Sequence, residues 1–223
     1  MNDINKINKM IKNVRLPEKL EKVFNVDFIS NLEKFEDIAN LYFENITFCD
    51  INITFYFENI YFLKCKFFNI DFSRCNYNNI KFQNCIFENC TFENTIFNQV
   101  LIDNCNLKNN NFEGASFNNF IVSNSVIKYN NFILSKFNYA KIIFSNMDYS
   151  FLSEVTFKNF LTYDTSWAKV EFFKTKLDKI DVSKCNIEGI IISNNFEELK
   201  GMIVSYDQAV SLSKLLGIVL KED

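Results

Sequence analysis

Residues 85–119 read CIFEN CTFEN TIFNQ VLIDN CNLKN NNFEG ASFNN when they are written in rows of five. The third residue of each row is large and apolar, and this column continues at every fifth residue from Phe57 to Ile192. Thr162 is the only residue of the column that is not apolar. An α-helix repeats at spacings of three and four residues and a strand at two, so neither explains a period of five.

A second column of mostly smaller residues lies two positions before the first. It is rich in Cys, Ser, Thr and Ala, with Ile, Val and a few Phe between them. Residues two apart on an extended backbone lie on the same side of the chain. Each unit therefore directs a small and a large residue inward and three mostly polar residues outward. The pattern predicts a chain that turns a corner every five residues around its own core.

Composition excludes several classes of function. The chain has 223 residues, 27 of them Phe and none His, so Ser-His-Asp triads, Cys-His pairs and imidazole zinc ligands are absent. We expect no catalysis, and the carboxylates of Asp178 and Asp181 fall on a smooth rod without a predicted cleft. A net charge of −3 leaves no basic patch for direct binding of nucleic acid.

The seven cysteines include no CxxC pair, which favours neither a disulfide framework nor a metal site, and no cofactor is expected. Most of them fall in the small inward column, whereas Cys49 faces outward in this frame. No apolar run approaches the ~20 residues that span a bilayer, and the first residues have no signal-peptide core. We therefore expect a cytoplasmic protein without membrane contact.

The five-residue units resemble those of pentapeptide-repeat proteins, and CIFEN, CTFEN, CNLKN and ASFNN carry the resemblance. The resemblance implies an all-β fold, a right-handed quadrilateral β-helix with twenty residues per coil and about 7–8 coils. Stacking at twenty residues places Cys65, Cys85 and Cys105 in one ladder. The two inward residues of a unit also compensate for each other in volume: where Thr162 is small, Phe160 two residues before it is large.

Three segments follow from this pattern: a helical segment or cap at 1–40, the β-helix at 41–196, and a capping helix with a strand at 197–223. In the first segment, Ile4, Ile7, Ile11 and Val14 form a helical stripe. Ser30 and Glu33 form a capping box ahead of Phe35 and Ile38. Whether this segment covers the first coil is left open. The frame before Phe57 is offset by one residue, which indicates a deletion at a corner.

The C-terminal segment leaves the five-residue frame. Ser205 and Gln208 form a second capping box, and Gly217 is a typical helix stop before an expected strand at residues 218–220. Such a helix can simply cover the end of the core, but its apolar residues exceed what a cap requires. We therefore expect a homodimer through the C-terminus, with an interface at Leu212, Leu215, Leu216, Ile218 and Val219.

The C-terminal sequence also resembles the end of the Qnr quinolone-resistance proteins. The residues that carry this resemblance are Asp207, Gln208, Ala209, Leu212, Leu216, Gly217, Ile218 and Val219, and LPEKL at 16–20 resembles their N-terminal segment. The uninterrupted period is similar to the loopless, chromosomal members of Gram-positive bacteria. The resemblance implies a dimeric, DNA-mimicking rod that binds DNA gyrase and topoisomerase IV and protects them from fluoroquinolones.

Counting charges by face identifies one acidic side, here named the candidate face: residues 71–74, 91–94, 111–114, 131–134, 151–154 and 171–174. It has two basic residues, Arg74 and Lys174, and five carboxylates, at Asp71, Glu93, Glu113, Glu154 and Glu171. A phosphate-like field toward a basic groove is one interpretation. Carboxylates scattered on a solvated face are the alternative interpretation of the charges. The alternative function is a generic pentapeptide-repeat scaffold or immunity factor with another protein partner.

Overall fold

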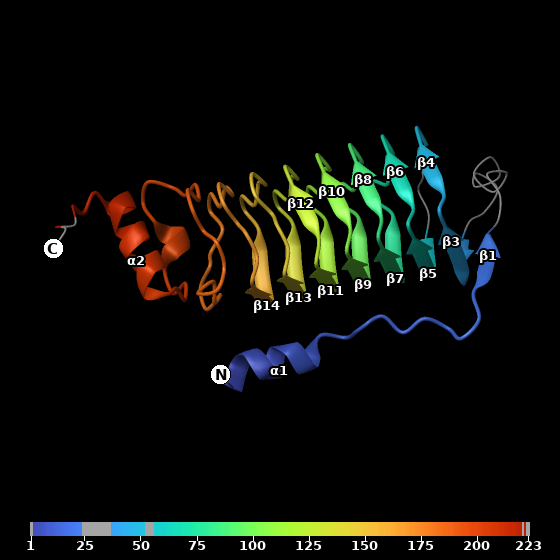
Figure 1. The fold of residues 1–223 in the computed structure, drawn as a ribbon, viewed down its shortest axis with the longest axis horizontal. Coiled ribbons are helices and arrows are strands. Elements are labelled where there is room, and N and C mark those ends of the chain that lie inside the picture. The colour runs from blue at the N-terminus through green and yellow to red at the C-terminus, as the bar shows by residue number, and fades with distance from the viewer. Residues whose placement is uncertain (1, 24–36, 52–55, 220, 222–223) are drawn as a thin grey trace.

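Stacked parallel strands build a rod in the computed structural model, which describes residues 2–23, 37–51, 56–219 and 221 (Figure 1). The main sheet contains six eight-residue strands: β5 (Tyr56–Leu63), β7 (Asn76–Gln83), β9 (Ile96–Asp103), β11 (Ser116–Ser123), β13 (Lys136–Ile143) and β14 (Thr156–Tyr163). Neighbouring strands pair at an interval of one coil, as in Tyr56↔Asn76 and Asn76↔Ile96. The twenty-residue coil and the all-β class are thus confirmed, as a parallel β-solenoid. It has about six turns, fewer than the expected 7–8 coils.

A second sheet lies on another side of the same coils. It consists of the three-residue strands β4 (Thr47–Cys49), β6 (Lys66–Phe68), β8 (Ile86–Glu88), β10 (Asn106–Lys108) and β12 (Val126–Lys128). On a further side, single bridges connect the coils, from Asp71↔Thr91 through to Glu171↔Ile191. These bridges place the residues of the candidate face on one side of the solenoid.

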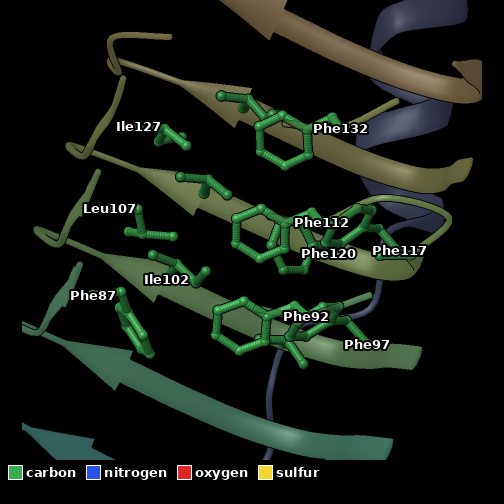
Figure 2. Packing of buried hydrophobic residues seen from close by; sticks show 14 of the residues in the cluster. Phe87, Phe92, Phe97, Ile102, Leu107, Phe112, Phe117, Phe120, Ile127 and Phe132 are labelled. Carbon is green, nitrogen blue, oxygen red and sulfur yellow. The ribbon is translucent and has the colours of Figure 1, made fainter. Parts of the chain in front are cut away.

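Both inward columns form the core. The large column is buried from Phe57 to Ile187 except at Phe157, which packs against the core partly buried, as does Ile192. Rings one coil apart stack face to face: Phe112 lies 4.8 Å from Phe92 and 4.9 Å from Phe132 between ring centroids. Figure 2 shows the rings of Phe92, Phe112 and Phe132 one above another in successive coils.

The corners explain the abundance of asparagine. Every fifth residue from Asn59 to Lys179 has a positive φ, between 47° and 66°. Asparagine adopts this left-handed region at lower cost than most residues, because its short polar side chain can bond locally. Many of the outward asparagines, such as Asn59, Asn79 and Asn119, are therefore corner residues, a role that the sequence pattern alone did not assign to them.

The small column supplies hydrogen bonds as well as space. The Thr95 hydroxyl donates to the carbonyl of Phe72 at 2.8 Å, and the Ser150 hydroxyl donates to that of Ile127 at 3.0 Å. Two asparagines also occupy the column, Asn110 and Asn130, which are 2% and 0% exposed. Since buried backbone groups need partners, these side chains satisfy amides and carbonyls that the corners leave without strand pairing.

Volume compensation within single units is confirmed. Thr162 is buried, and the ring of Phe160 lies 4.5 Å from that of Phe157 and 6.2 Å from that of Trp167. The Phe120 ring likewise lies 4.6 Å from Phe117 beside the smaller Val122. A close-packed interior requires such exchange.

Part of the N-terminal segment is strand rather than helix, so the helical expectation for 1–40 was wrong there. Helix α1 covers only Asn2–Met10, while β1 (Glu21–Val23) pairs with β3 (Leu41–Glu44), and β2 (Asp37–Ala39) pairs with β5. Ile38 lies five residues before Phe43 and is 2% exposed, so it continues the inward column. The capping box at Ser30 and Glu33 lies outside the described residues.

The offset before Phe57 is confirmed by strand register. Tyr42 pairs with Tyr61, and Tyr61 pairs with Lys81. The first interval is one residue shorter than the second. The corner at 52–55, where the deletion was expected, lies outside the described residues.

The first residues form a strap along the side of the rod rather than a cap on the first coil. Helix α1 lies beside β14, and the chain then runs back past the coils toward β1 (Figure 1). Ile11 is 5% exposed and packs with Ile121 and Leu161. Corner amides hold the strap backbone: Asn119 accepts from the Lys12 amide at 3.1 Å, and Asn79 bonds both the amide and the carbonyl of Arg15 at 2.8 Å.

The C-terminal helix α2 (Tyr206–Ser213) begins at the predicted capping box. Ser205 Oγ accepts from the Gln208 amide, Gln208 Oε1 accepts from the Ser205 amide, and Gly217 ends the helical segment at φ 73°. The predicted strand at 218–220 is not formed at its described residues, Ile218 and Val219. A strand needs an edge to pair with, and these two residues are 50% and 92% exposed.

Candidate functional site

The five predicted carboxylates lie on one side of the solenoid, on the candidate face. Asp71 and Glu171 lie on one ladder of bridges, separated by Thr91, Asn111, Asn131 and Phe151. Five steps separate the two carboxylates, which is about 24 Å at ~4.8 Å per strand. Glu93 and Glu113 occupy equivalent positions in successive coils, because Asn94 pairs its amide with the Glu113 carbonyl.

Neighbouring side chains fix most of these carboxylates. Asn111 Nδ2 donates to Glu93 Oε1 at 2.7 Å, and Ser153 Oγ donates to Glu171 Oε1 at 2.7 Å. Asp71 Oδ1 accepts from the backbone amide of Ser73 at 2.8 Å. A salt bridge to Lys174 at 3.1 Å balances Glu154. The negative field of the candidate face therefore comes mainly from Asp71, Glu93 and Glu113 in its N-terminal half and from Glu171 in its C-terminal half.

The C-terminal half of the candidate face gathers exposed apolar side chains, which the sequence reasoning missed. Six exposed side chains, here named the apolar patch, lie on this half and on the corner beside it, each 38–48% exposed: Tyr129, Leu134, Tyr149, Phe151, Phe173 and Ile191. The rings of Tyr129 and Tyr149 stack at 5.1 Å. The available signal was large apolar residues at outward positions, where earlier coils carry Asn, Thr, Ser or Glu.

The predicted dimer residues divide into two groups. Leu212 is partly buried and packs against the core, beside Leu199, Met202 and Val204 at the end of the solenoid. Leu215, Leu216, Ile218 and Val219 are 44%, 53%, 50% and 92% exposed. The chain thus presents four apolar side chains at its C-terminal end after covering its own core.

The cysteines follow the predicted division. Six are buried and Cys49 is exposed. The neighbouring Cys105 thiol and burial raise the pKa of Cys85 to about 12, and burial raises the pKa of Cys90 to about 11. Since the thiolate is the reactive form, these buried thiols act as packing residues.

We predict that one thiol, Cys49, reacts with a disulfide reagent in the native protein at pH 8. The other six require unfolding, because their thiols are enclosed and, at Cys65, Cys85, Cys90 and Cys185, their pKa is raised. Thiol titration with and without denaturant measures both numbers. Cys49→Ser should abolish the native reaction, and rapid reaction of a further thiol in folded protein would contradict the burial described above.

No cluster of three or more His, Cys, Asp or Glu side chains among the described residues is arranged to ligate a metal ion. A groove of about 1030 Å³ lies between α1 and the last coils, and its described lining contains three lysines and one carboxylate, that of Asp181. The paired carboxylates that would support an acid–base reaction do not line this groove. Within the described part of the chain, no helix is long and apolar enough to cross a membrane.

Comparison with known proteins gives two family matches. A model described as Pentapeptide repeats (9 copies) matches residues 62–101, and one described as Pentapeptide repeats (8 copies) matches residues 85–124. No curated protein matches the chain.

Similar solved structures include a trypsin-treated form of QnrB1, a plasmid-mediated fluoroquinolone resistance protein. It is 15% identical with a TM-score of 0.49, and the match covers 81% of this chain and 100% of that one. HetL, a pentapeptide repeat protein involved in heterocyst differentiation regulation in the cyanobacterium Nostoc, is 11% identical with a TM-score of 0.38, covering 82% and 98%. Residues 62–124 are thus pentapeptide repeats, and the same five-residue geometry continues beyond them to Lys179.

Proposed function

We propose that this chain binds type II topoisomerases, DNA gyrase or topoisomerase IV, through the candidate face and protects them from fluoroquinolones. The observation that carries the proposal is the one-sided placement of carboxylates on a straight stack of coils. Asp71, Glu93 and Glu113 present negative charge at regular intervals to one side. Such a surface is complementary to a basic DNA-binding groove.

The ends of the chain support the same proposal. The capping box at Ser205 and Gln208 and the turn at Gly217 form as expected in the segment that resembles Qnr proteins. The four exposed apolar residues at the C-terminus are suited to a homodimer contact, in which Ile218 and Val219 would find the strand partner that one chain lacks. The register from β5 to β14 continues without an inserted loop, which favours the loopless type.

A supercoiling assay tests the proposal. Purified chain is titrated into DNA gyrase with a fixed, inhibitory concentration of ciprofloxacin. We expect supercoiling activity to be restored in a concentration-dependent manner, and loss of supercoiling at high protein concentration without drug. If the chain changes neither activity nor drug inhibition, a scaffold for a different protein partner becomes the better assignment.

Charge reversal tests whether the candidate face is the contact. Glu93→Lys, Glu113→Lys and Glu171→Lys together should abolish gyrase binding, because the surface becomes repulsive to a basic groove. The matched control makes the same change of charge at exposed carboxylates elsewhere: Asp164→Lys, Asp178→Lys and Glu188→Lys. Equal loss in both variants would mean that net charge matters and the candidate face does not.

A further inference from the structure

The apolar patch carries an inference about how a partner is held. A soluble protein seldom gathers several large apolar side chains on one exposed site, and such patches mark interaction surfaces. Phe151 follows Asn131 in the ladder of bridges, and Ile191 follows Glu171 two steps later. Tyr129 and Tyr149 form the adjoining corner. The patch therefore extends over several coils in the C-terminal half of the candidate face. It lies beyond Asp71, Glu93 and Glu113, and Glu171 lies between Phe151 and Ile191 in the same ladder.

Three patch residues occupy corners at a conformational cost. Tyr129, Leu134 and Tyr149 have φ values of 60°, 61° and 61°. The left-handed region costs about 1–2 kcal/mol for a residue with an ordinary side chain, and less for asparagine. Equivalent corners in earlier coils carry Asn69, Asn89, Asn94 and Asn109. Bulky residues at strained and exposed positions occur at functional sites, and the corner at Phe144 shares this geometry on another side of the solenoid.

The charges around the patch indicate what occupies it. Toward the N-terminal coils lie Asp71, Glu93 and Glu113, whereas Glu154 beside the patch is balanced by Lys174. Lys169 lies over the ring of Tyr149 at 5.1 Å and adds a positive charge at this corner, while Glu171 lies between Phe151 and Ile191 in the ladder of bridges. The complementary surface has apolar side chains opposite the patch and lysine or arginine opposite the three carboxylates.

We propose that the candidate face is a two-part docking surface, in which the apolar patch anchors a protein partner and the carboxylates orient it through its basic residues. This inference rests on the proposed function, under which the partner is the topoisomerase. Apolar burial in the centre of an interface supplies most of the affinity, while charges steer association. The patch therefore sets the strength of binding, and the carboxylates set its salt dependence.

The test replaces patch residues by those that the same ladders use in other coils. The patch variant is Leu134→Asn, Tyr149→Asn, Phe151→Thr and Phe173→Ser, following Asn94, Asn109, Thr91 and Ser153. The control variant removes exposed apolar side chains from other sides: Ile96→Ser, Val126→Asn and Phe144→Asn, following Ser116, Asn106 and Asn124. Both variants introduce residues that already occupy equivalent positions in other coils, so both should fold. A cooperative thermal unfolding transition for each variant checks this.

Binding to immobilised DNA gyrase is then measured at several salt concentrations. We expect the patch variant to bind at least ten-fold more weakly at every concentration with an unchanged salt slope, and the control to bind like the original chain. The triple lysine variant should lose binding most at low salt, because salt screens its charges and not apolar contact.

Each outcome separates the two proposals. If the original chain does not bind gyrase, the proposed function fails and the assignment of this partner fails with it. If it binds and the patch variant binds equally well, the docking inference alone is overturned. A second copy of the chain is the other candidate for the patch, and sedimentation of the same proteins tests it. A drop in mass for the patch variant only would show that the patch contacts a second copy.

Discussion

Replacing Phe117 by alanine is expected to lower the free energy of unfolding by about 3–5 kcal/mol. The side chain is 0% exposed, and its ring stacks between those of Phe97 at 5.0 Å and Phe137 at 4.4 Å. The ring of Phe120 closes the same site from within the unit at 4.6 Å. Because the coils above and below are held in register by eight-residue strands, the cavity cannot collapse, and most of its cost remains.

Urea unfolding followed by circular dichroism measures this change. The matched control is Phe173→Ala, the same substitution at a ring that is 38% exposed, for which we expect a loss below about 1 kcal/mol. Similar losses at the two positions would mean that the stack of rings does not hold the coils together.

Asn130→Ala is expected to cost about 2–5 kcal/mol although it removes only a small polar side chain. Asn130 is fully buried, and its Oδ1 accepts from the Asn110 amide at 2.7 Å while its Nδ2 donates to the Leu107 carbonyl at 3.0 Å. Alanine would remove both partners inside an apolar core. An unsatisfied buried backbone group costs about 1–3 kcal/mol.

Serine at the same position should be far milder. One coil further along, Ser150 Oγ accepts from the Asn130 amide and donates to the Ile127 carbonyl, at 3.2 Å and 3.0 Å. Asn130→Ser can repeat this arrangement, so we expect a loss of less than about 1.5 kcal/mol in the same urea experiment. Equal losses for alanine and serine would indicate that volume and not hydrogen bonding decides this position.

The repeat itself made the core predictable. A period of five identifies both inward columns, the stacking interval of twenty and the outward position of Cys49 without reference to any distant contact. The offset near Phe57 is visible for the same reason, because a shift of frame is a local property of the sequence.

The strap could not be predicted in this way. Arg15 bonds Asn79, and Lys12 bonds Asn119, through backbone groups that leave no signature in the residues of the strap. The apolar patch was open to prediction, because the stacking interval of twenty places Tyr129 beside Tyr149, but a count of charges by face does not register apolar side chains. At the C-terminus, Ile218 and Val219 have strand-forming character, but a strand requires an edge to pair with, and these two residues pair with none in the described part of the chain.

The strap also affects the order in which the molecule is assembled. Coils of a solenoid interact with their neighbours, so each can add to the stack as soon as it leaves the ribosome. The strap leaves first, yet its site at Asn79, Asn119 and Leu161 is complete only after β14 has been synthesised. It therefore closes only after β14 is in place, as a latch that joins the coil of β7 to the coil of β14. Loss of the β14 coil would remove Leu161 from this site, so unfolding of a late coil is communicated to the earlier coils that the strap contacts.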